Sequence, residues 1–233
     1  MVLADTFERW NAIVAVLAKD ANHLDQIINT LTRPMKNKVV EMQVTTRLRC
    51  HYGSTCILNP SYQVIKSAPV TPPPVARMDE KDLKIIHLLA TDARMSARKI
   101  GGFVGLSPST VQSRIARLEE NKVIVGYRAI YDYSQLGYFV SRLLFRLAEP
   151  ASTITNQITK ELFRTGMVNI VARHLGFADL DARCFALSIN DLSTLISGIR
   201  DKFVDDILRV EIVPILRWQF VNHLPIEEIE GVL

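Results

Sequence analysis

Apolar residues between residues 78 and 121 recur every three or four positions, the period of an amphipathic helix. Asp79, Ser96 and the Ser107-Pro108 pair favour helix starts, because their side chains can cap a helix and proline is tolerated at its first position. Gly105 supplies a turn. We therefore expect a helix, a short helix, a turn and a third helix, whose inward-facing residues are Leu83, Ile86, Leu89, Ala90, Ile100, Phe103, Val111, Ile115 and Leu118.

The expected third helix has a polar and basic face opposite its apolar face. This polar face consists of Ser109, Thr110, Gln112, Ser113, Arg114 and Arg117, with no acid before Glu119. Such side chains suit base edges and the phosphates beside them, although a solvated surface helix would have a similar face. The spacing of helix, short helix, turn and helix favours DNA binding. The alternating stretch 123–133 then predicts a strand or hairpin in the position of a wing.

Residues 139–218 have the pattern of four strands and two helices. Residues 139–147 and 168–174 are rich in strand-forming residues, and residues 180–187 alternate with a period of two, as do residues 209–212. Two sets of residues have helical spacing: Ile154, Ile158 and Leu162, and then Leu192, Leu195, Ile196, Ile199 and Phe203. The order β-α-β-β-α-β is that of a ferredoxin-like plait.

The chain also matches itself without gaps at an offset of 168 residues. Leu24 falls on Leu192 and Ile28 on Ile196, and residues from about 8 to 50 follow the second half of the plait. Chance similarity between two β-α-β segments is the alternative. A β-α-β half has no central strand, so we expect it to borrow one from residues 52–66 or from another chain.

Composition and charge narrow the picture further. With 233 residues, 48% hydrophobic and 22% charged, the chain has the composition of a folded protein with one large or two small domains. Residues 77–128 carry a net charge of +4 and residues 129–233 a net charge of −3, so a nucleic-acid contact is expected in the middle. Five prolines between residues 59 and 77 indicate an extended linker.

Motifs for catalysis, metal binding and membrane insertion were sought and not found. No apolar run approaches ~18 residues, and the N-terminus does not have the basic region of a signal peptide. Cys50, Cys56 and Cys184 fit neither a disulfide framework nor a zinc site, and indicate reduced thiols in a cytoplasm. There is no HExxH, GxSxG, P-loop or Rossmann motif. We expect no cofactor, no metal and no enzymatic activity.

Taken together, residues 78–218 resemble the Lrp/AsnC (feast/famine) family of transcriptional regulators. The stretch MDEKDLKIIHLLATDARMSARKIGGFVGLSPSTVQSRIARLEENKVIVGY resembles the family's helix-turn-helix, and Gly176-Phe177-Ala178-Asp179 resembles its G-x-x-D turn. The implied fold is α+β. It has a winged helix-turn-helix DNA-binding domain and a ferredoxin-like βαββαβ plait domain of the RAM type, preceded here by a partial β-α-β plait.

The resemblance implies a cytoplasmic, nucleoid-associated regulator that binds pseudo-palindromic double-stranded DNA, forms homodimers and assembles further, often into octamers. It implies a small effector, such as an amino acid, bound between plait domains. The expected DNA-binding residues are Ser96, Arg98, Ser107, Ser109, Thr110, Gln112, Ser113, Arg114 and Arg117. The expected effector-binding residues are His174, Gly176, Phe177 and Asp179. Two alternatives stay open: Asp179 could cap its own turn, and His174 could be a core or interface histidine.

The proline run, the self-match and the resemblance together give five segments. These are a partial plait (1–58), a proline-rich linker (59–77), a helix-turn-helix domain (78–137), a ligand-sensing and dimerisation plait (138–222) and a tail (223–233). In the N-terminal copy, Glu8 and Asn11 stand where Gly176 and Asp179 stand in the plait. We expect that copy to affect assembly rather than bind the effector.

Two other functions remain open. Some Lrp-like proteins resemble haem-precursor (sirohaem) decarboxylases, which use the same scaffold for catalysis. The dense candidates for such a site are His174, Arg173 and Arg183. The second possibility is a partner protein that joins another regulator through its plait. The polar and basic third helix favours the DNA-binding regulator over both.

Overall fold

The computed structural model describes residues 2–6, 9–53, 66–69, 78–127 and 131–220. The chain divides into two compact units, which are described separately. One unit contains Thr71–Tyr131 and the other contains Val2–Val70 together with Asp132–Phe220. The tail predicted at 223–233 and most of the predicted linker lie outside the described residues.

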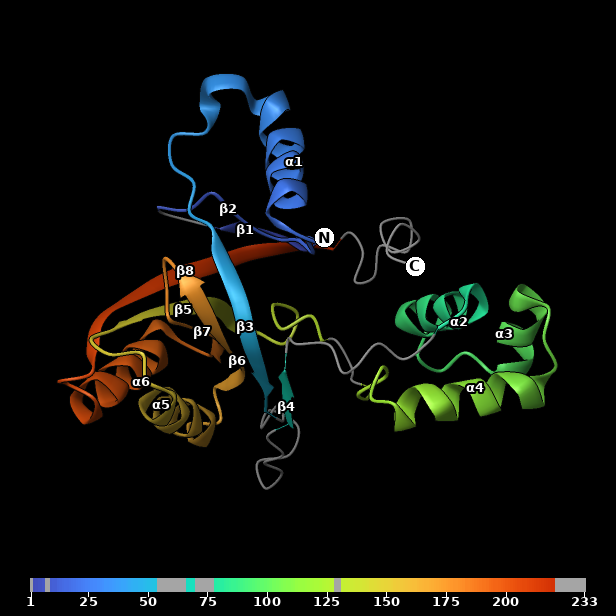
Figure 1. The fold of residues 1–233 in the computed structure, drawn as a ribbon. Helices are drawn as coiled ribbons and strands as arrows, with labels where there is room; N and C mark the ends of the chain where they lie inside the picture. The colour runs from blue at the N-terminus through green and yellow to red at the C-terminus, as the bar shows by residue number, and fades with distance from the viewer. Residues whose placement is uncertain (1, 7–8, 54–65, 70–77, 128–130, 221–233) are drawn as a thin grey trace. The chain divides into compact units, whose positions relative to one another are not determined.

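The first unit contains three helices: α2 (Glu80–Thr91), α3 (Ala97–Val104) and α4 (Pro108–Glu120) (Figure 1). Each begins at the capping residue expected from the sequence, because the side chains of Asp79, Ser96 and Ser107 all accept a backbone N–H from the first turn. α3 ends at Gly105, whose φ of +65° is the left-handed conformation that favours glycine. The core of this unit joins all three helices through the fully buried Ile85, Ile100 and Val111.

Three expectations for this unit are wrong. Ala90 of α2 is exposed, and Ile85, which was not among the residues expected to face inward, is fully buried. Phe103 is 64% exposed, and Val104 is buried in its place, because the short α3 turns its next position toward α2 and α4. The described part of the stretch 123–133 contains no strand, and residues 128–130 lie outside the described residues. The apolar alternation that predicted a wing therefore does not produce a strand in residues 123–127 or 131–133.

The second unit is built on one eight-stranded antiparallel sheet with the order β2-β1-β8-β5-β7-β6-β3-β4. Its middle four strands form the predicted plait: β5 (Phe139–Leu147), β6 (Val168–Gly176), β7 (Leu180–Ala186) and β8 (Ile207–Phe220). The helices α5 (Ser152–Arg164) and α6 (Ile189–Lys202) lie side by side against the sheet (Figure 1). Fully buried Leu143, Ile158 and Leu162 lie in the core between sheet and helices.

The N-terminal segment extends this sheet at both edges. β1 (Val2–Thr6) pairs with β8 and with β2 (Ala12–Ala15), and β3 (Thr45–Tyr52) pairs with β6. Between β2 and β3 lie α1 (Ala21–Thr32) and the 3-10 helix η1 (Arg33–Lys38). The segment was expected to borrow a central strand from residues 52–66 or from another chain. Instead, β2 pairs with β1, and the plait strands β8 and β6 are the inner neighbours of β1 and β3.

Part of the predicted linker is a strand. β4 (Lys66–Pro69) pairs with the outer edge of β3, with Pro69 opposite Arg49. β4 is itself an edge strand, where proline is tolerated because the missing N–H leaves no buried partner unsatisfied. The prolines indicated an extended conformation correctly, but they did not reveal that four residues add to the sheet.

Candidate DNA-binding helix and effector turn

The start of α4 carries five exposed neutral polar residues, three of which lie on one face. Ser109, Gln112 and Ser113 are exposed, while Val111 and Leu118 face the core. Ser107 caps the helix, since its hydroxyl accepts the Thr110 N–H at 3.2 Å and lies 2.7 Å from the Thr110 hydroxyl, although both residues are also exposed. Ser109, Gln112 and Ser113 thus form one face, here called the α4 face.

Two arginines of α4 bind carboxylates at the start of α2. Nη1 of Arg114 donates to both oxygens of Asp79, at 2.8 and 2.7 Å, and to Oδ1 of Asp82 at 2.8 Å. Nη2 of Arg117 donates to Oδ2 of Asp82 at 2.5 Å. The Arg114 guanidinium lowers the pKa of Asp79, and both carboxylates raise the pKa of Arg114. These ion pairs hold α4 against the N-terminus of α2.

The sequence placed all of these polar residues on a DNA-contacting face, and the structure divides them. The side chain of Arg114 is 22% exposed and its Nη1 binds Asp79 and Asp82 inside the unit, whereas the side chain of Arg117 is 48% exposed. Ser96 caps α3 by accepting the Lys99 N–H at 3.3 Å, and Arg98 is exposed on the same helix. The groups open to a ligand are therefore the α4 face, Arg98 and part of Arg117.

The turn between β6 and β7 contains the other set of predicted residues. Oδ2 of Asp179 accepts the Leu147 N–H at 2.8 Å, and Oδ1 lies 3.3 Å from Nη1 of Arg146. That Nη1 also donates to the Gly176 carbonyl at 2.9 Å. Asp179 is 7% exposed, so its carboxylate fastens the turn to β5. This differs from the capping of its own turn that was left open from the sequence, because the N–H that Asp179 accepts belongs to Leu147 of β5.

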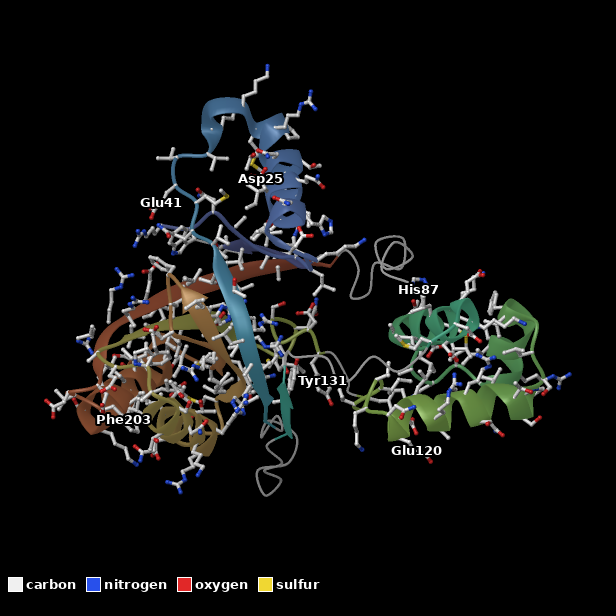
Figure 2. All side chains as sticks on the ribbon, in the orientation of Figure 1. Asp25, Glu41, His87, Glu120, Tyr131 and Phe203 are labelled. Atoms are coloured by element: carbon white, nitrogen blue, oxygen red, sulfur yellow. The ribbon has the colours of Figure 1, made fainter. Side chains whose placement is uncertain are left out.

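The N-terminal segment covers this turn. The Phe177 ring meets the Trp10 ring edge to face with centroids 5.4 Å apart, and the Arg9 guanidinium lies 5.4 Å from the Phe177 centroid. Arg9 in turn donates to Glu41 at 2.6 Å. Figure 2 labels Glu41, which lies between η1 and β3. A Cβ on Gly176, whose φ is +122°, would lie 2.7 Å from the Val44 carbonyl oxygen.

His174 lies beneath this cover and is neutral. Its Nδ1 is 3.0 Å from the Thr45 hydroxyl, and its buried Nε2 has no hydrogen-bond partner among the described residues. Burial, together with the nearby guanidiniums of Arg47 and Arg142, lowers the pKa of His174 to about 4. The 3.6 Å approach of Nε2 to Asp181 is therefore a contact with a neutral imidazole.

The three residues considered for catalysis do not converge. Arg173 donates to Ser152 at 3.2 Å and to the Pro150 carbonyl at 2.9 Å, on the α5 side of the sheet. His174 follows Arg173 on the same strand and points to the opposite face, because side chains alternate along a strand. Arg183 donates to Asn169 at 2.9 Å. Within the described part of the chain no cluster of three or more potential metal ligands is found.

The sequence did not predict the residues that bind the two predicted sites: Asp82 at the arginines of α4, and Arg9 and Trp10 at Phe177. Asp82 forms a capping box with Asp79 at the start of α2, and its second role as the anchor of Arg114 and Arg117 depends on α2 and α4 meeting. Trp10 and Arg9 gave no signal beyond the self-match of the chain. No helix in the described residues is long and apolar enough to cross a membrane.

Comparisons with known proteins agree with this geometry. The model of the AsnC-type helix-turn-helix domain matches residues 78–119. The HTH-type transcriptional regulator Ptr1 of Methanocaldococcus jannaschii is 32% identical over 126 residues, which are 54% of this chain and 81% of that protein. An uncharacterised HTH-type transcriptional regulator of Pyrococcus furiosus is 28% identical over 133 residues, which are 57% of this chain and 86% of that protein.

Solved structures share the fold. A Neisseria meningitidis transcriptional regulator in complex with L-Met matches with a TM-score of 0.57 at 17% identity, covering 67% of this chain and all of that one. Escherichia coli AsnC matches with a TM-score of 0.54 at 21% identity, covering 64% of this chain and 99% of that one. About a third of this chain therefore has no counterpart in either structure.

Proposed function

Because the chain belongs to the Lrp/AsnC family of transcriptional regulators, we propose that it reads a pseudo-palindromic DNA site with the α4 face. The exposed amide of Gln112 supports this assignment most strongly, since a glutamine can donate to and accept from an adenine edge in the major groove. Ser109 and Ser113 lie beside it and can bond bases or phosphates. Two such helices on a homodimer would reach half-sites about 10 base pairs, or a multiple of that, apart.

The arginines have separate roles in this proposal. Arg114 positions α4, because its guanidinium is already shared between Asp79 and Asp82. Arg117 keeps N–H groups that can reach a phosphate, and Arg98 adds a second exposed cation at the preceding helix. Affinity would then depend on salt through Arg98 and Arg117, and sequence preference would depend on the α4 face.

The turn that contains Gly176, Phe177 and Asp179 is the proposed effector site. Among the described residues, Oδ1 of Asp179 has one hydrogen-bond partner, Nη1 of Arg146 at 3.3 Å, so it retains capacity for an ammonium group. The solved regulator with bound L-Met supports an amino acid as the class of effector. Trp10 and Phe177 cover the turn, so effector binding requires this cover to open. We place the protein at the nucleoid in the cytoplasm, as a homodimer that can assemble further.

A selection of random and native upstream duplexes by the full chain tests the function. It is run at several salt concentrations, with and without a mixture of amino acids. A recovered pseudo-palindrome whose affinity falls with salt supports the DNA-binding proposal. A shift in affinity with one amino acid supports the effector proposal separately. Recovery of no sequence at any salt concentration would overturn the first.

A further inference from the structure

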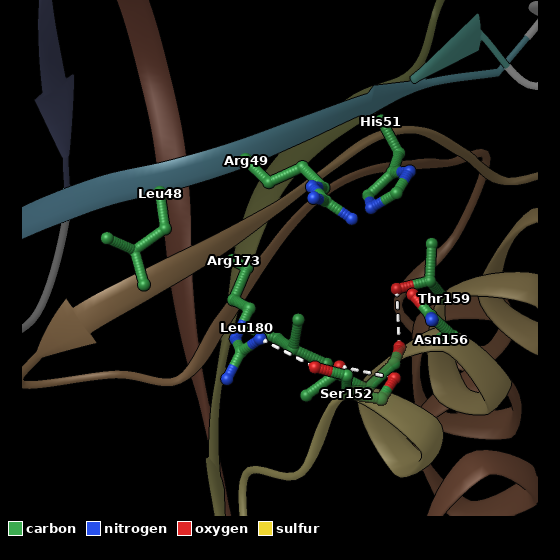
Figure 3. Close-up of a pocket in the computed structure, with 9 residues that line it drawn as sticks. Leu48, Arg49, His51, Ser152, Asn156, Thr159, Arg173 and Leu180 are labelled. Atoms are coloured by element: carbon green, nitrogen blue, oxygen red, sulfur yellow. Dashed lines mark hydrogen bonds between the residues drawn. The ribbon is translucent and has the colours of Figure 1, made fainter. Parts of the chain in front are cut away.

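A polar cavity lies between β3 and α5, on the side of the sheet that faces the helices. It has a volume of about 140 Å³. Arg49 and His51 enter it from β3, and Figure 3 shows them facing Ser152 and Asn156 of α5 across the open space. The cavity is separate from the α4 face and from the turn at residues 176–179. It exists because β3 of the N-terminal segment pairs with the edge of the plait.

The cavity is lined by two arginines from opposed positions of neighbouring strands. The register of β3 and β6 places Arg49 opposite Arg173. Like charges at opposed positions of neighbouring strands destabilise the pairing. Arg173 is satisfied in part by Ser152 and the Pro150 carbonyl, whereas no hydrogen bond or ion pair of Arg49 is found among the described residues. No carboxylate belongs to the described lining.

Two further lining residues can donate hydrogen bonds to a ligand. Asn156 supplies an amide, and the Ser152 hydroxyl accepts from Arg173 while keeping its own hydrogen to donate. α5 begins after Ala151, which has no side-chain acceptor to cap the first turn. The N–H groups of that turn add a positive potential at the start of the helix. Burial and the Arg49 charge both lower the pKa of His51, so the arginines supply the positive charge.

We propose that this cavity binds a small oxyanion, a phosphate or carboxylate group, between Arg49 and Arg173. Guanidinium groups match both kinds of anion with paired N–H donors. The volume is well above the ~10–15 Å³ that one water molecule needs, so a phosphate-sized group fits. A bound anion would remove the repulsion between the opposed arginines. It would therefore strengthen the attachment of β3 to the plait.

Titration of the full chain with inorganic phosphate and, separately, with acetate tests the proposal and distinguishes the two kinds of anion. Calorimetry gives the affinity, and the melting temperature gives the stabilisation. We expect at least one of the anions to bind and to raise the melting temperature. Arg49→Gln should weaken binding at least tenfold. Arg33→Gln, which removes an exposed charge from the same N-terminal segment, should leave binding unchanged.

A second variant covers the case in which Arg49→Gln does not fold. Asn156→Asp places a carboxylate inside the cavity, so it should abolish anion binding and raise the melting temperature without added anion. Duplex DNA binding should be unchanged in Arg49→Gln, because the ligand is a small anion and not the DNA backbone. The proposal is overturned if wild type binds neither anion, if Arg33→Gln loses as much affinity as Arg49→Gln, or if Asn156→Asp binds as wild type does.

Discussion

The α4 face and the turn at residues 176–179 carry the family's two sequence signatures, and their surroundings differ. In α4 the charged residues are paired with Asp79 and Asp82, and the neutral face is left open to solvent. In the turn, Asp179 is fastened to β5 and Phe177 lies against Trp10. A residue of a family motif can therefore have its side chain bound to a residue outside that motif, and the motif alone does not predict this.

The largest effect on stability is expected from removing the Asp82 carboxylate, which binds both arginines of α4. Asp82→Ala should destabilise the helix-turn-helix unit by about 3 kcal/mol, because Asp82 is 1% exposed and its loss leaves Arg114 and Arg117 without their shared partner. Hydrogen exchange of the α4 amides measures this change. Lys81→Ala, at the exposed neighbouring position, is the matched control. Equal protection in Asp82→Ala and wild type would show that these pairs do not position α4.

The pH dependence of stability tests the covered turn at residues 176–179, through the buried His174 beside it. His174 has a folded-state pKa of about 4, below the ordinary value of 6.5, so the unfolded chain takes up its proton first as the pH falls. Neutral His174 therefore contributes fully to the free energy of unfolding above about pH 6.5. As the pH falls from about 6.5 to 4, this free energy decreases by at most about 3 kcal/mol. Denaturation of the plait unit should show a flatter pH profile in His174→Gln than in wild type. Parallel profiles would contradict the buried neutral histidine.

Removing Trp10, which covers the turn at residues 176–179, should leave the turn open to solvent, as the α4 face is. Trp10→Ala removes an edge-to-face aromatic contact worth about 0.5–1.5 kcal/mol, so amino-acid affinity should rise by roughly 2- to 12-fold. Calorimetric titration of each variant with the amino acid found by selection measures the change. Leu17→Ala, an exposed apolar residue of the same segment, is the control. A weaker affinity in Trp10→Ala would mean that Trp10 belongs to the binding site.

The smallest effect is expected on the salt dependence of DNA binding by the helix-turn-helix unit. Arg98→Ala should reduce the slope of the logarithm of DNA affinity against the logarithm of salt concentration by about 1, with sequence preference retained. Binding measured at four salt concentrations gives this slope, and Arg94→Ala, before the start of α3, is compared beside it. An unchanged slope in Arg98→Ala removes this residue from the phosphate contacts.

The elements were predicted more completely than their contacts. Capping residues such as Asp79 and Ser107 act within four residues of themselves, so the helix starts could be read from the sequence. The plait order followed in the same way from alternation and helical spacing. Phe103 shows the limit, because a short amphipathic helix of eight residues leaves open which of two neighbouring apolar residues faces the core.

Contacts between distant segments could not be predicted. The Arg114–Asp82 pair joins two helices 32 residues apart, and the cover on Phe177 comes from a segment more than 160 residues earlier. The repeat shows the same limit. α1 and α6 have matching apolar positions, yet α1 has no buried residue, whereas Leu195 and Ile199 of α6 are buried. Helical spacing specifies an apolar face, but the partner that covers it depends on the whole sheet.

The central claim is that the neutral α4 face, held by the arginine pairs, reads the DNA sequence. The most direct test is the affinity ratio between the selected duplex and a scrambled duplex, measured for wild type and for the double variant Gln112→Ala/Ser113→Ala at one salt concentration. We predict that the ratio falls by roughly 5- to 100-fold while affinity for the scrambled duplex stays the same. An unchanged ratio in a folded double variant would contradict the account and assign sequence reading to another surface.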